Sequence, residues 1–234
     1  MALATSRTPP NRYLFQKGRP MKLRRLLPLL GAAALLTAAL VLLLPQRYYT
    51  AAQLGITQLQ SETDADGDGL EDWMDMTLGA RAYIATDPHY ASKYYAGGYP
   101  DDGLGVCTDV IWQAFRAAGY ELKDLIDADI AAAPGAYPFI PTPDGNIDFR
   151  RVNTLDTFFR RHAQVLTCSF DDPQAWQPGD IVIFGQRDHV AICSDRRNRD
   201  GIPFIIHHGN PVEDAVEKNQ IYRMPVTGHF RWLG

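Results

Sequence analysis

The sequence predicts an α+β fold in which helices precede an antiparallel sheet. Two observations indicate this class. Residues 103–119, GLGVCTDVIWQAFRAAG, carry apolar side chains at helical spacing. After WQPGD the period changes, and IVIF, HVAIC, PFIIHH and VTGHFRW are typical of short strands separated by turns and by the polar loop SDRRNRDGI. A helical part followed by a run of strands favours α+β.

The N-terminal residues 1–25 are basic, with seven Lys or Arg and no acid, and residues 26–44 form a charge-free apolar run. The run is about as long as a membrane-spanning helix, and no small-residue cleavage site follows it. We therefore predict a single-pass signal-anchor with a cytoplasmic N-terminus and a domain outside the cytoplasm. Met21 as the true start and a buried core helix are the alternatives.

The part that would be exported is more acidic than the net charge of -4 for the whole chain, because the basic N-terminus is not part of it. This balance argues against a nucleic-acid partner. Cys107, Cys168 and Cys193 allow one disulfide in an oxidising compartment. Cys168 with Cys193 is the expected pair, although Cys193 fits equally well as a small buried residue on a strand.

Residues 45–63 are predicted to be a linker, and residues 64–75, DADGDGLEDWMD, a calcium-binding-type loop. Counted from Asp64, aspartates stand at positions 1, 3, 5, 9 and 12, with a glycine at position 6. This spacing supplies the oxygens that calcium prefers. A solvated acidic turn capping the next helix, residues 71–85, is the alternative. The predicted ligands of a structural Ca²⁺ are Asp64, Asp66, Asp68, Asp72, Asp75 and the carbonyl of Leu70.

Cys107 stands directly before an apolar stripe at helical spacing, and Gly119 stands where a C-terminal cap belongs. Cys107 is therefore expected at a helix N-terminus. Free backbone N–H groups and the helix dipole there lower a thiol pKa and favour a nucleophile. FRRVNTLDTFFRRHA, after a Pro-rich loop, predicts a second amphipathic helix over residues 149–163.

A thiolate that attacks an acyl group needs an imidazole within hydrogen-bond reach and a group that orients the imidazole. His189 opens the second strand, and His207 and His208 close the third. If these strands form a hairpin near Asn198, His189 comes opposite this pair, and only one of the two shares its face. We predict a catalytic set from these residues. Zinc binding is the alternative, but the spacing matches no compact zinc pattern.

A family resemblance supports this set. YYAGGYPDDGLGVCTDVIWQAF, PGDIVIF, DHVAI and PFIIHH together resemble the NlpC-like cell-wall peptidases, which are papain-like cysteine enzymes. More closely, GVCTDV, NIDFRR, PGDIV, SDRRNRDGIP, IIHH and TGHFRW are similar to the bacterial YijF-like family of uncharacterised domains, commonly placed in that superfamily. The resemblance covers most of residues 76–234.

The resemblance implies a papain-like fold and a cysteine amidase or endopeptidase that cleaves peptidoglycan stem peptides or cross-bridges without a catalytic cofactor. It implies Cys107 as nucleophile, His189 as general base and His207 as the orienting residue, with His208 as the alternate. Tyr94 stands where a tyrosine lines the substrate cleft in that family.

One position departs from the family pattern. The aspartate that commonly precedes the nucleophile, and helps to hold a stem-peptide amine, is Val106 here. Asp109, displaced into the helix, is the remaining candidate for that contact, so the bond that is cut stays open. Two other functions also stay open: a non-catalytic, calcium-stabilised module that binds wall or protein, and a papain-like acyltransferase.

Overall fold

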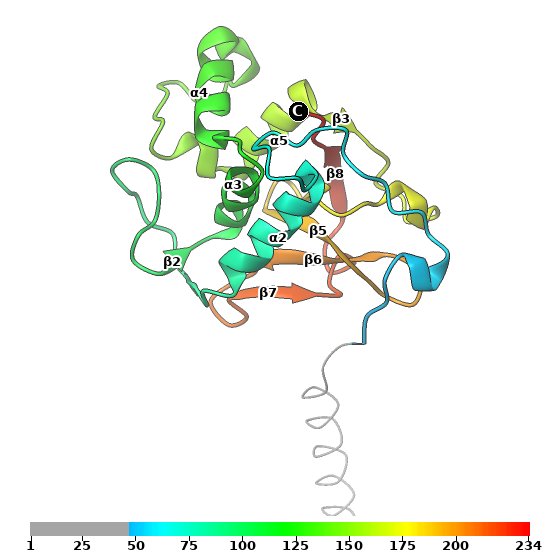
Figure 1. Ribbon diagram of the computed structural model, residues 1–234. Coiled ribbons are helices and arrows are strands. Elements are labelled where there is room, and N and C mark those ends of the chain that lie inside the picture. Colours follow the sequence, from blue (N-terminus) through cyan, green and yellow to red (C-terminus); the bar gives the residue numbers. More distant parts are fainter. Residues whose placement is uncertain (1–46) are drawn as a thin grey trace, which may run out of the picture. The chain divides into compact units, whose positions relative to one another are not determined.

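A computed structural model describes residues 47–234 of the chain (Figure 1). The predicted cytoplasmic segment, residues 1–25, and the predicted signal-anchor, residues 26–44, lie outside the described residues. Among the helices of residues 47–234, none is both long and apolar enough to cross a membrane.

The main elements of the described part are four α-helices and a mainly antiparallel set of strands. The helices are α2 (Asp72–Ile84), α3 (Cys107–Ala117), α4 (Leu122–Ala132) and α5 (Val152–His162). The strands are β1 (His89–Tyr90), β2 (Leu104–Gly105), β3 (Gln164–Val165), β4 (Ile181–Phe184), β5 (His189–Arg197), β6 (Pro203–His208), β7 (Ala215–Lys218) and β8 (Val226–Arg231). Short 3₁₀ turns are η2 (Ala52–Leu54), η3 (Pro134–Ala136), η4 (Asp148–Arg150) and η5 (Pro173–Ala175).

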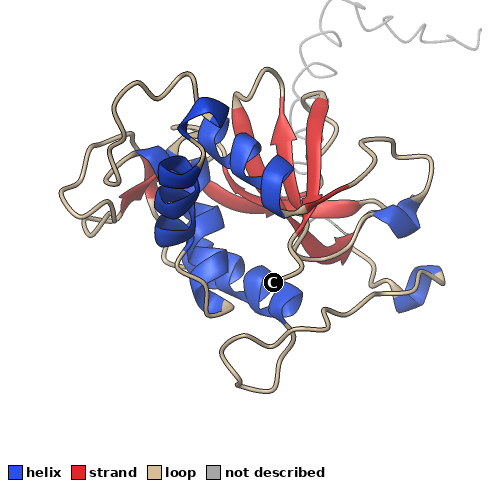
Figure 2. Cartoon of the chain, turned by 90° about the horizontal axis from the view of Figure 1, so that it is seen from above, coloured by secondary structure: helices blue, strands red, loops and turns tan. Residues whose placement is uncertain are grey.

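Six strands form one antiparallel sheet in the order β3-β8-β4-β5-β6-β7, and β1 pairs in parallel with β2. Alternating side chains send Ile183, Val190 and Ile206 into the core beneath the helices. Phe184 and Ile205 face the opposite side, where Trp176 and Ile221 cover the sheet. Figure 1 shows α2 and α3 side by side near β5 and β6, and Figure 2 shows the helices grouped beside the strands.

Helix α3 begins at Cys107, as predicted, and its apolar stripe is fully buried. Gly119, just beyond its end, has φ +81°. A side chain there would also meet Asp66, whose Cβ lies 3.0 Å from the position of an added Cβ. The glycine therefore serves both the left-handed turn and the close approach of the 64–75 loop.

The antiparallel α+β architecture agrees with the prediction, and β6 has the predicted bounds, 203–208. Strand β5 is longer than HVAIC and runs through Arg197 into the segment predicted to be a polar loop. Arg197 is buried there because its guanidinium donates to the backbone carbonyls of Gly201 and Trp176. The turn itself is near Asn198, as expected.

The segment predicted as a linker, residues 45–63, is not a free tether where the structure describes it. Tyr49 exchanges backbone hydrogen bonds of 2.8 Å with Arg197 at the end of β5. Leu59 donates its N–H to the side chain of Gln177 at 3.0 Å. Backbone pairing to a strand end and to a buried amide docks this segment on the domain.

The three cysteines are free thiols, so the expected Cys168–Cys193 disulfide is not formed. Cys193 lies on β5 with its side chain fully buried in the sheet core. The alternative, a small buried residue on a strand, describes it correctly.

Candidate active site

The first turn of α3, which carries Cys107, is held by a buried ion pair. Asp109 accepts the backbone N–H of Val106 at 2.7 Å, which caps the helix start. The guanidinium of Arg150 donates to both Asp109 oxygens, at 2.7 and 2.8 Å. Both side chains are almost completely buried. A bidentate pair of this kind fixes the direction in which the helix begins.

The placement of Asp109 argues against the predicted substrate contact. Its oxygens already accept from Val106, Arg150 and the indole of Trp112. A fully buried and paired carboxylate has no route to a ligand, so Asp109 positions the helix start instead. The partner lies 41 residues away in the sequence, in η4, and sequence reasoning did not find it.

Cys107 is 7% exposed, and burial raises the pKa of its thiol to about 11. The backbone N–H groups of Val190, Thr108 and Cys107 oppose this shift and do not overcome it. The predicted lowering of the pKa at the helix start is therefore wrong, because desolvation outweighs the helix terminus. The resting thiol is protonated at neutral pH. Val190 follows His189 directly, which brings the thiol to the beginning of β5.

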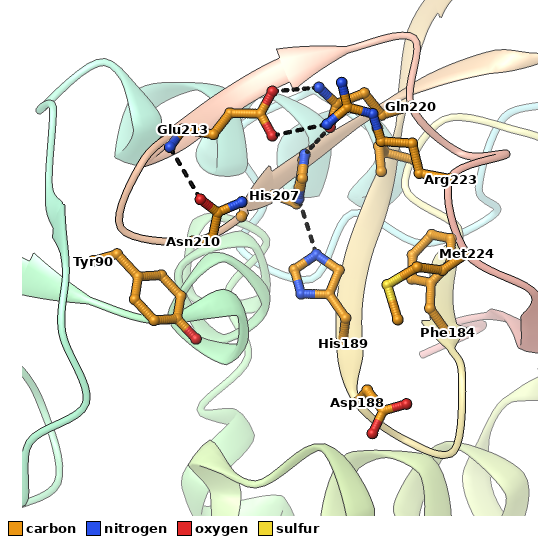
Figure 3. A pocket seen from close by; sticks show the side chains of 12 residues that line it. Tyr90, Phe184, Asp188, His189, His207, Asn210, Glu213, Gln220, Arg223 and Met224 are labelled. Atoms are coloured by element: carbon orange, nitrogen blue, oxygen red, sulfur yellow. Dashed lines mark hydrogen bonds and ion pairs between the residues drawn. The ribbon is translucent and has the colours of Figure 1, made fainter.

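His189 and His207 form a hydrogen-bonded dyad. His189 Nε2 lies 2.9 Å from His207 Nδ1, between the neighbouring strands β5 and β6 (Figure 3). His208 points to the other face of the sheet, where its Nδ1 lies 3.3 Å from the Tyr83 hydroxyl. Of the two alternatives left by the sequence, the structure therefore joins His207 to His189.

Two further polar residues extend the dyad into a row of hydrogen-bonded side chains: His189, His207, Gln220 and Glu213. The side-chain oxygen of Gln220 lies 3.1 Å from His207 Nε2, and its amide nitrogen donates to Glu213 (Figure 3). Glu213 also pairs with Lys218 at 2.8 Å. Burial raises the pKa of Glu213, but bonds from Lys218 and Gln220 outweigh it and keep the pKa below its usual value. Gln220 and Glu213 are functional candidates that the sequence did not reveal.

This row fixes the tautomer of each ring. An ionised carboxylate only accepts, so Gln220 turns its NH₂ to Glu213 and its oxygen to His207. His207 Nε2 must then carry the proton. Burial lowers the pKa of His207 to about 4, so the ring is neutral and its Nδ1 accepts from His189 Nε2–H.

The same reasoning leaves a lone pair on His189 Nδ1. Burial, and then the neighbouring His207, lower the pKa of His189 to about 3, so this ring is also neutral at pH 7. With Nε2 protonated, Nδ1 is unprotonated and able to take a proton. The free lone pair meets the geometric requirement for a general base, whereas the lowered pKa makes the resting ring a weak one.

The dyad opens into a pocket of about 400 Å³. Tyr90, Asp188, Asn210 and Arg223 are among its lining residues (Figure 3). Cys107 does not line it. Tyr90 does line the pocket, and burial, followed by the charge that Cys107 would carry as a thiolate, raises the pKa of its phenol.

Tyr94, predicted to contact substrate, lies away from this pocket. It is 59% exposed, and its hydroxyl donates to Asp144 and accepts from Asn146 at 2.9 Å. Tyr90, four residues earlier on β1, is the tyrosine that the structure brings to the dyad. Its backbone N–H donates to Asp214 Oδ1 at 3.0 Å, which ties β1 to the segment after β6.

The five aspartates predicted as calcium ligands divide into three groups. Asp64, Asp66 and Asp68 gather on an exposed loop with one oxygen each within 4.8 Å of the others. Asp72 turns away and accepts from Thr63, Ala65 and Tyr120. Burial, and then Asp68 and Asp66, raise the pKa of Asp75 to about 6. Asp72 is therefore engaged within the protein, and the position-9 ligand is not supported.

Comparison with known proteins gives the family. The domain of unknown function DUF1287 matches residues 77–232. The chain belongs to this family. It is 34% identical over 185 residues to the uncharacterized protein YijF of Escherichia coli (strain K12), covering 76% of this chain and 86% of that protein. No solved structure shows significant similarity to the chain.

Several sequence motifs of this DUF1287 chain stabilise the fold and do not contribute to the candidate site. Asp180, in PGDIV, receives two bonds from the guanidinium of Arg231 and one contact of 2.9 Å from His229, both in TGHFRW. His229 stacks on Trp176 with the ring centroids 3.9 Å apart. These motifs join β4 to β8, whereas the candidate chemistry comes from GVCTDV, DHVAI and IIHH.

Proposed function

We propose that this DUF1287 protein is a membrane-anchored, extracytoplasmic cysteine amidase or endopeptidase of the NlpC-like, papain-like superfamily that cleaves amide bonds in peptidoglycan peptides. The observation that carries the proposal is the His189–His207 dyad, whose tautomers leave a lone pair on His189 Nδ1. A thiol at a helix start beside the first residues of the same strand supplies the nucleophile. The predicted signal-anchor would hold the domain at the cell membrane.

Because the resting thiol is protonated, attack and deprotonation occur together. In this mechanism the bound substrate brings Cys107 Sγ within hydrogen-bond reach of His189 Nδ1. Sγ then forms a bond to the carbonyl carbon while its proton moves to that nitrogen. The C–N bond then breaks, and the same proton passes to the leaving amine. Water gives a proton to His189 and attacks the thioester, the C–S bond breaks, and the thiol is restored with a free carboxyl product.

The charge that develops on the carbonyl oxygen needs fixed donors. The backbone N–H of Cys107 and a neighbouring N–H at the start of α3 supply them in this proposal. His207 accepts from His189 Nε2 and stabilises the imidazolium that forms during the reaction. Gln220 and Glu213 hold His207 in the tautomer that carries its proton on Nε2, which leaves Nδ1 free to accept from His189.

The pocket offers charges of both signs to a peptide with free ends. Asp188 is exposed beside His189, and Arg223 lies across the pocket near Glu213 (Figure 3). Asp188 in this proposal takes the substrate amine in place of the aspartate that Val106 replaces. Arg223 takes a carboxylate. Amide bonds close to a charged peptide end are therefore the expected substrates.

The test uses the full-length chain in detergent with purified peptidoglycan, alongside Cys107→Ala, His189→Ala and the matched control Cys168→Ala. Mass spectrometry identifies the released fragments. Wild type and Cys168→Ala should produce the same new peptide ends, and the other two variants should produce none. Equal release by Cys107→Ala would contradict the thiol mechanism.

A second function, the non-catalytic wall- or protein-binding module, is favoured by one observation: burial of Cys107 and the raised pKa of its thiol. Alkylation of Cys107 with and without a peptidoglycan fragment, together with a search for cleavage products, separates the two functions. In both cases iodoacetamide should react slowly at pH 6 and faster towards pH 10, because only the thiolate attacks. The non-catalytic binding module is supported if a peptidoglycan fragment changes the rate at which iodoacetamide alkylates Cys107 and no cleavage products form.

A further inference from the structure

The acidic loop has a feature that the proposed chemistry does not use. Asp64, Asp66 and Asp68 place one carboxylate oxygen each within a 4.8 Å group on the surface. The loop holds them there itself, since Asp64 accepts from the N–H groups of Gly67 and Gly69 at 2.8 and 3.0 Å. Three like charges at this separation repel one another unless a cation lies between them.

A second, independent observation comes from the first turns of α2. Asp75 is 7% exposed, and its Oδ2 is buried without a hydrogen-bond partner. An unpartnered buried carboxylate oxygen is costly. Asp75 shares the first turn of α2 with Asp72, whose Oδ1 accepts the N–H of Ala65 in the loop at 2.9 Å, so this turn of the helix lies against the loop.

We propose that Asp64, Asp66, Asp68 and Asp75 bind one divalent cation of the size of Ca²⁺. The donors are all carboxylate oxygens, which hard cations prefer, and no Cys or His belongs to the set. Asp75 lies outside the 4.8 Å group, so the cation draws the loop and α2 together when it binds. The carbonyl of Leu70 is the further ligand that the spacing predicts.

The position of the loop determines what the cation does. Asp66 lies against Gly119, directly after α3, and Asp72 accepts from the hydroxyl of Tyr120. The same Asp72 begins α2, which packs along α3. A cation at Asp75 therefore braces the start of α2 against the end of the helix that carries Cys107. This inference does not depend on the chemistry at Cys107.

The experiment is a calcium titration of the full-length chain in detergent after treatment with EDTA. Isothermal titration calorimetry measures the affinity, and melting temperature measures the effect on the fold. We expect one site with a Kd below about 1 mM, the range of extracellular calcium modules, and a melting temperature that rises with Ca²⁺. No binding up to several millimolar Ca²⁺ would overturn the proposal.

Two variants and one control assign the ligands. Asp68→Asn should weaken binding by about tenfold or more, because ligand charge tunes affinity. Asp124→Asn, an exposed acid on α4, is the matched control and should bind as wild type does. Equal loss of affinity in the Asp124 variant would mean a general charge effect and would overturn the site.

Asp75→Asn should shift the melting temperature in opposite directions in the absence and in the presence of Ca²⁺. Without Ca²⁺ this variant should melt at or above the wild-type temperature, because a buried charge among like charges is removed. With Ca²⁺ it should melt below wild type, because the fourth ligand is weakened. A variant with the wild-type affinity would exclude Asp75 from the site.

Discussion

Glu213 decides which nitrogen of His189 is free, although the two residues do not touch. Its ionised oxygen orients Gln220, the amide oxygen of Gln220 selects Nε2–H on His207, and His207 Nδ1 selects Nε2–H on His189. Each step follows from the number of donors and acceptors on the group. A neutral amide thus acts as the link between a carboxylate and a base.

Replacing Gln220 by Leu should lower kcat/KM of the proposed hydrolase by about 10- to 100-fold, because the buried His207 Nε2–H loses its acceptor at a cost of about 1–3 kcal/mol. The conservative Gln220→Glu variant keeps an acceptor and should recover part of the loss. The rate of peptide release at fixed pH is the measurement.

The matched control is Gln164→Leu, an exposed glutamine on β3. A purely structural role for Gln220 would be indicated if Gln220→Leu lost stability and its kcat/KM stayed at the Gln164→Leu level. That outcome would contradict tautomer control.

Some residues of the candidate site could be predicted from the sequence, and others could not. Cys107 and His189 were predicted as site residues from their residue types and their spacing, whereas the choice of His207 over His208 came from the family resemblance. Gln220 is a neutral amide 13 residues beyond His207, and no periodic pattern marks it. The pKa of Cys107 could not be predicted because burial, which the sequence does not give, outweighs the helix terminus.

Helix α3 is held at both ends by contacts from distant parts of the chain. At its start Arg150 of η4 pairs with Asp109, and Thr108 donates to the carbonyl of Arg150 at 3.1 Å. At its end Gly119 admits the 64–75 loop. The position of the thiol therefore depends on η4 and on that loop.

Arg150→Met should lower the free energy of unfolding by about 3–5 kcal/mol, because Asp109 keeps a buried charge without its cation. Arg199→Met is the matched control, since this arginine and its partner Asp200 are both exposed. It should change the stability little. Urea denaturation of the full-length variants measures both.

An equal loss of stability in the two variants would contradict a special role for the Arg150–Asp109 pair. A smaller loss for Arg150→Met with a normal thiol environment would show that another cation replaces the guanidinium.

At the level of elements, long periodic segments were predictable and short irregular ones were not. The start of α3, the bounds of β6 and the turn near Asn198 follow from patterns within each segment. Strand β7 escaped prediction because all four of its residues are half-buried, which leaves no alternation. Helix α4 was not predicted, although Leu122, Ile126 and Ile130 recur at helical spacing and are buried.

The domain as a whole should lose stability in mild acid. Burial lowers the pKa of His189 to about 3 and of His207 to about 4, whereas an unfolded histidine titrates near 6.5. Between these values the unfolded chain binds more protons than the folded one. The stabilisation is therefore present above pH 6.5 and is lost as the pH falls towards 4.

His189→Asn should reduce the stability difference between pH 7 and pH 5 by about 2 kcal/mol, the share of one such histidine. His89→Asn is the control, because the side chain of His89 is exposed. Urea denaturation at pH 5, 6 and 7 gives the values. An unchanged pH dependence in His189→Asn would mean that His189 is not buried as a neutral ring.

The docking of Tyr49 on Arg197 sets a working distance for the proposed enzyme. An extended chain spans at most about 3.6 Å per residue. If a membrane anchor ends at residue 44, residues 45–49 form a linker to the domain that spans at most about 18 Å. Only the wall material next to the bilayer would then be within reach. Release of residues 49–63 from the domain would lengthen this linker by about 50 Å. The docked segment would therefore determine how far from the membrane the proposed enzyme can cleave the wall.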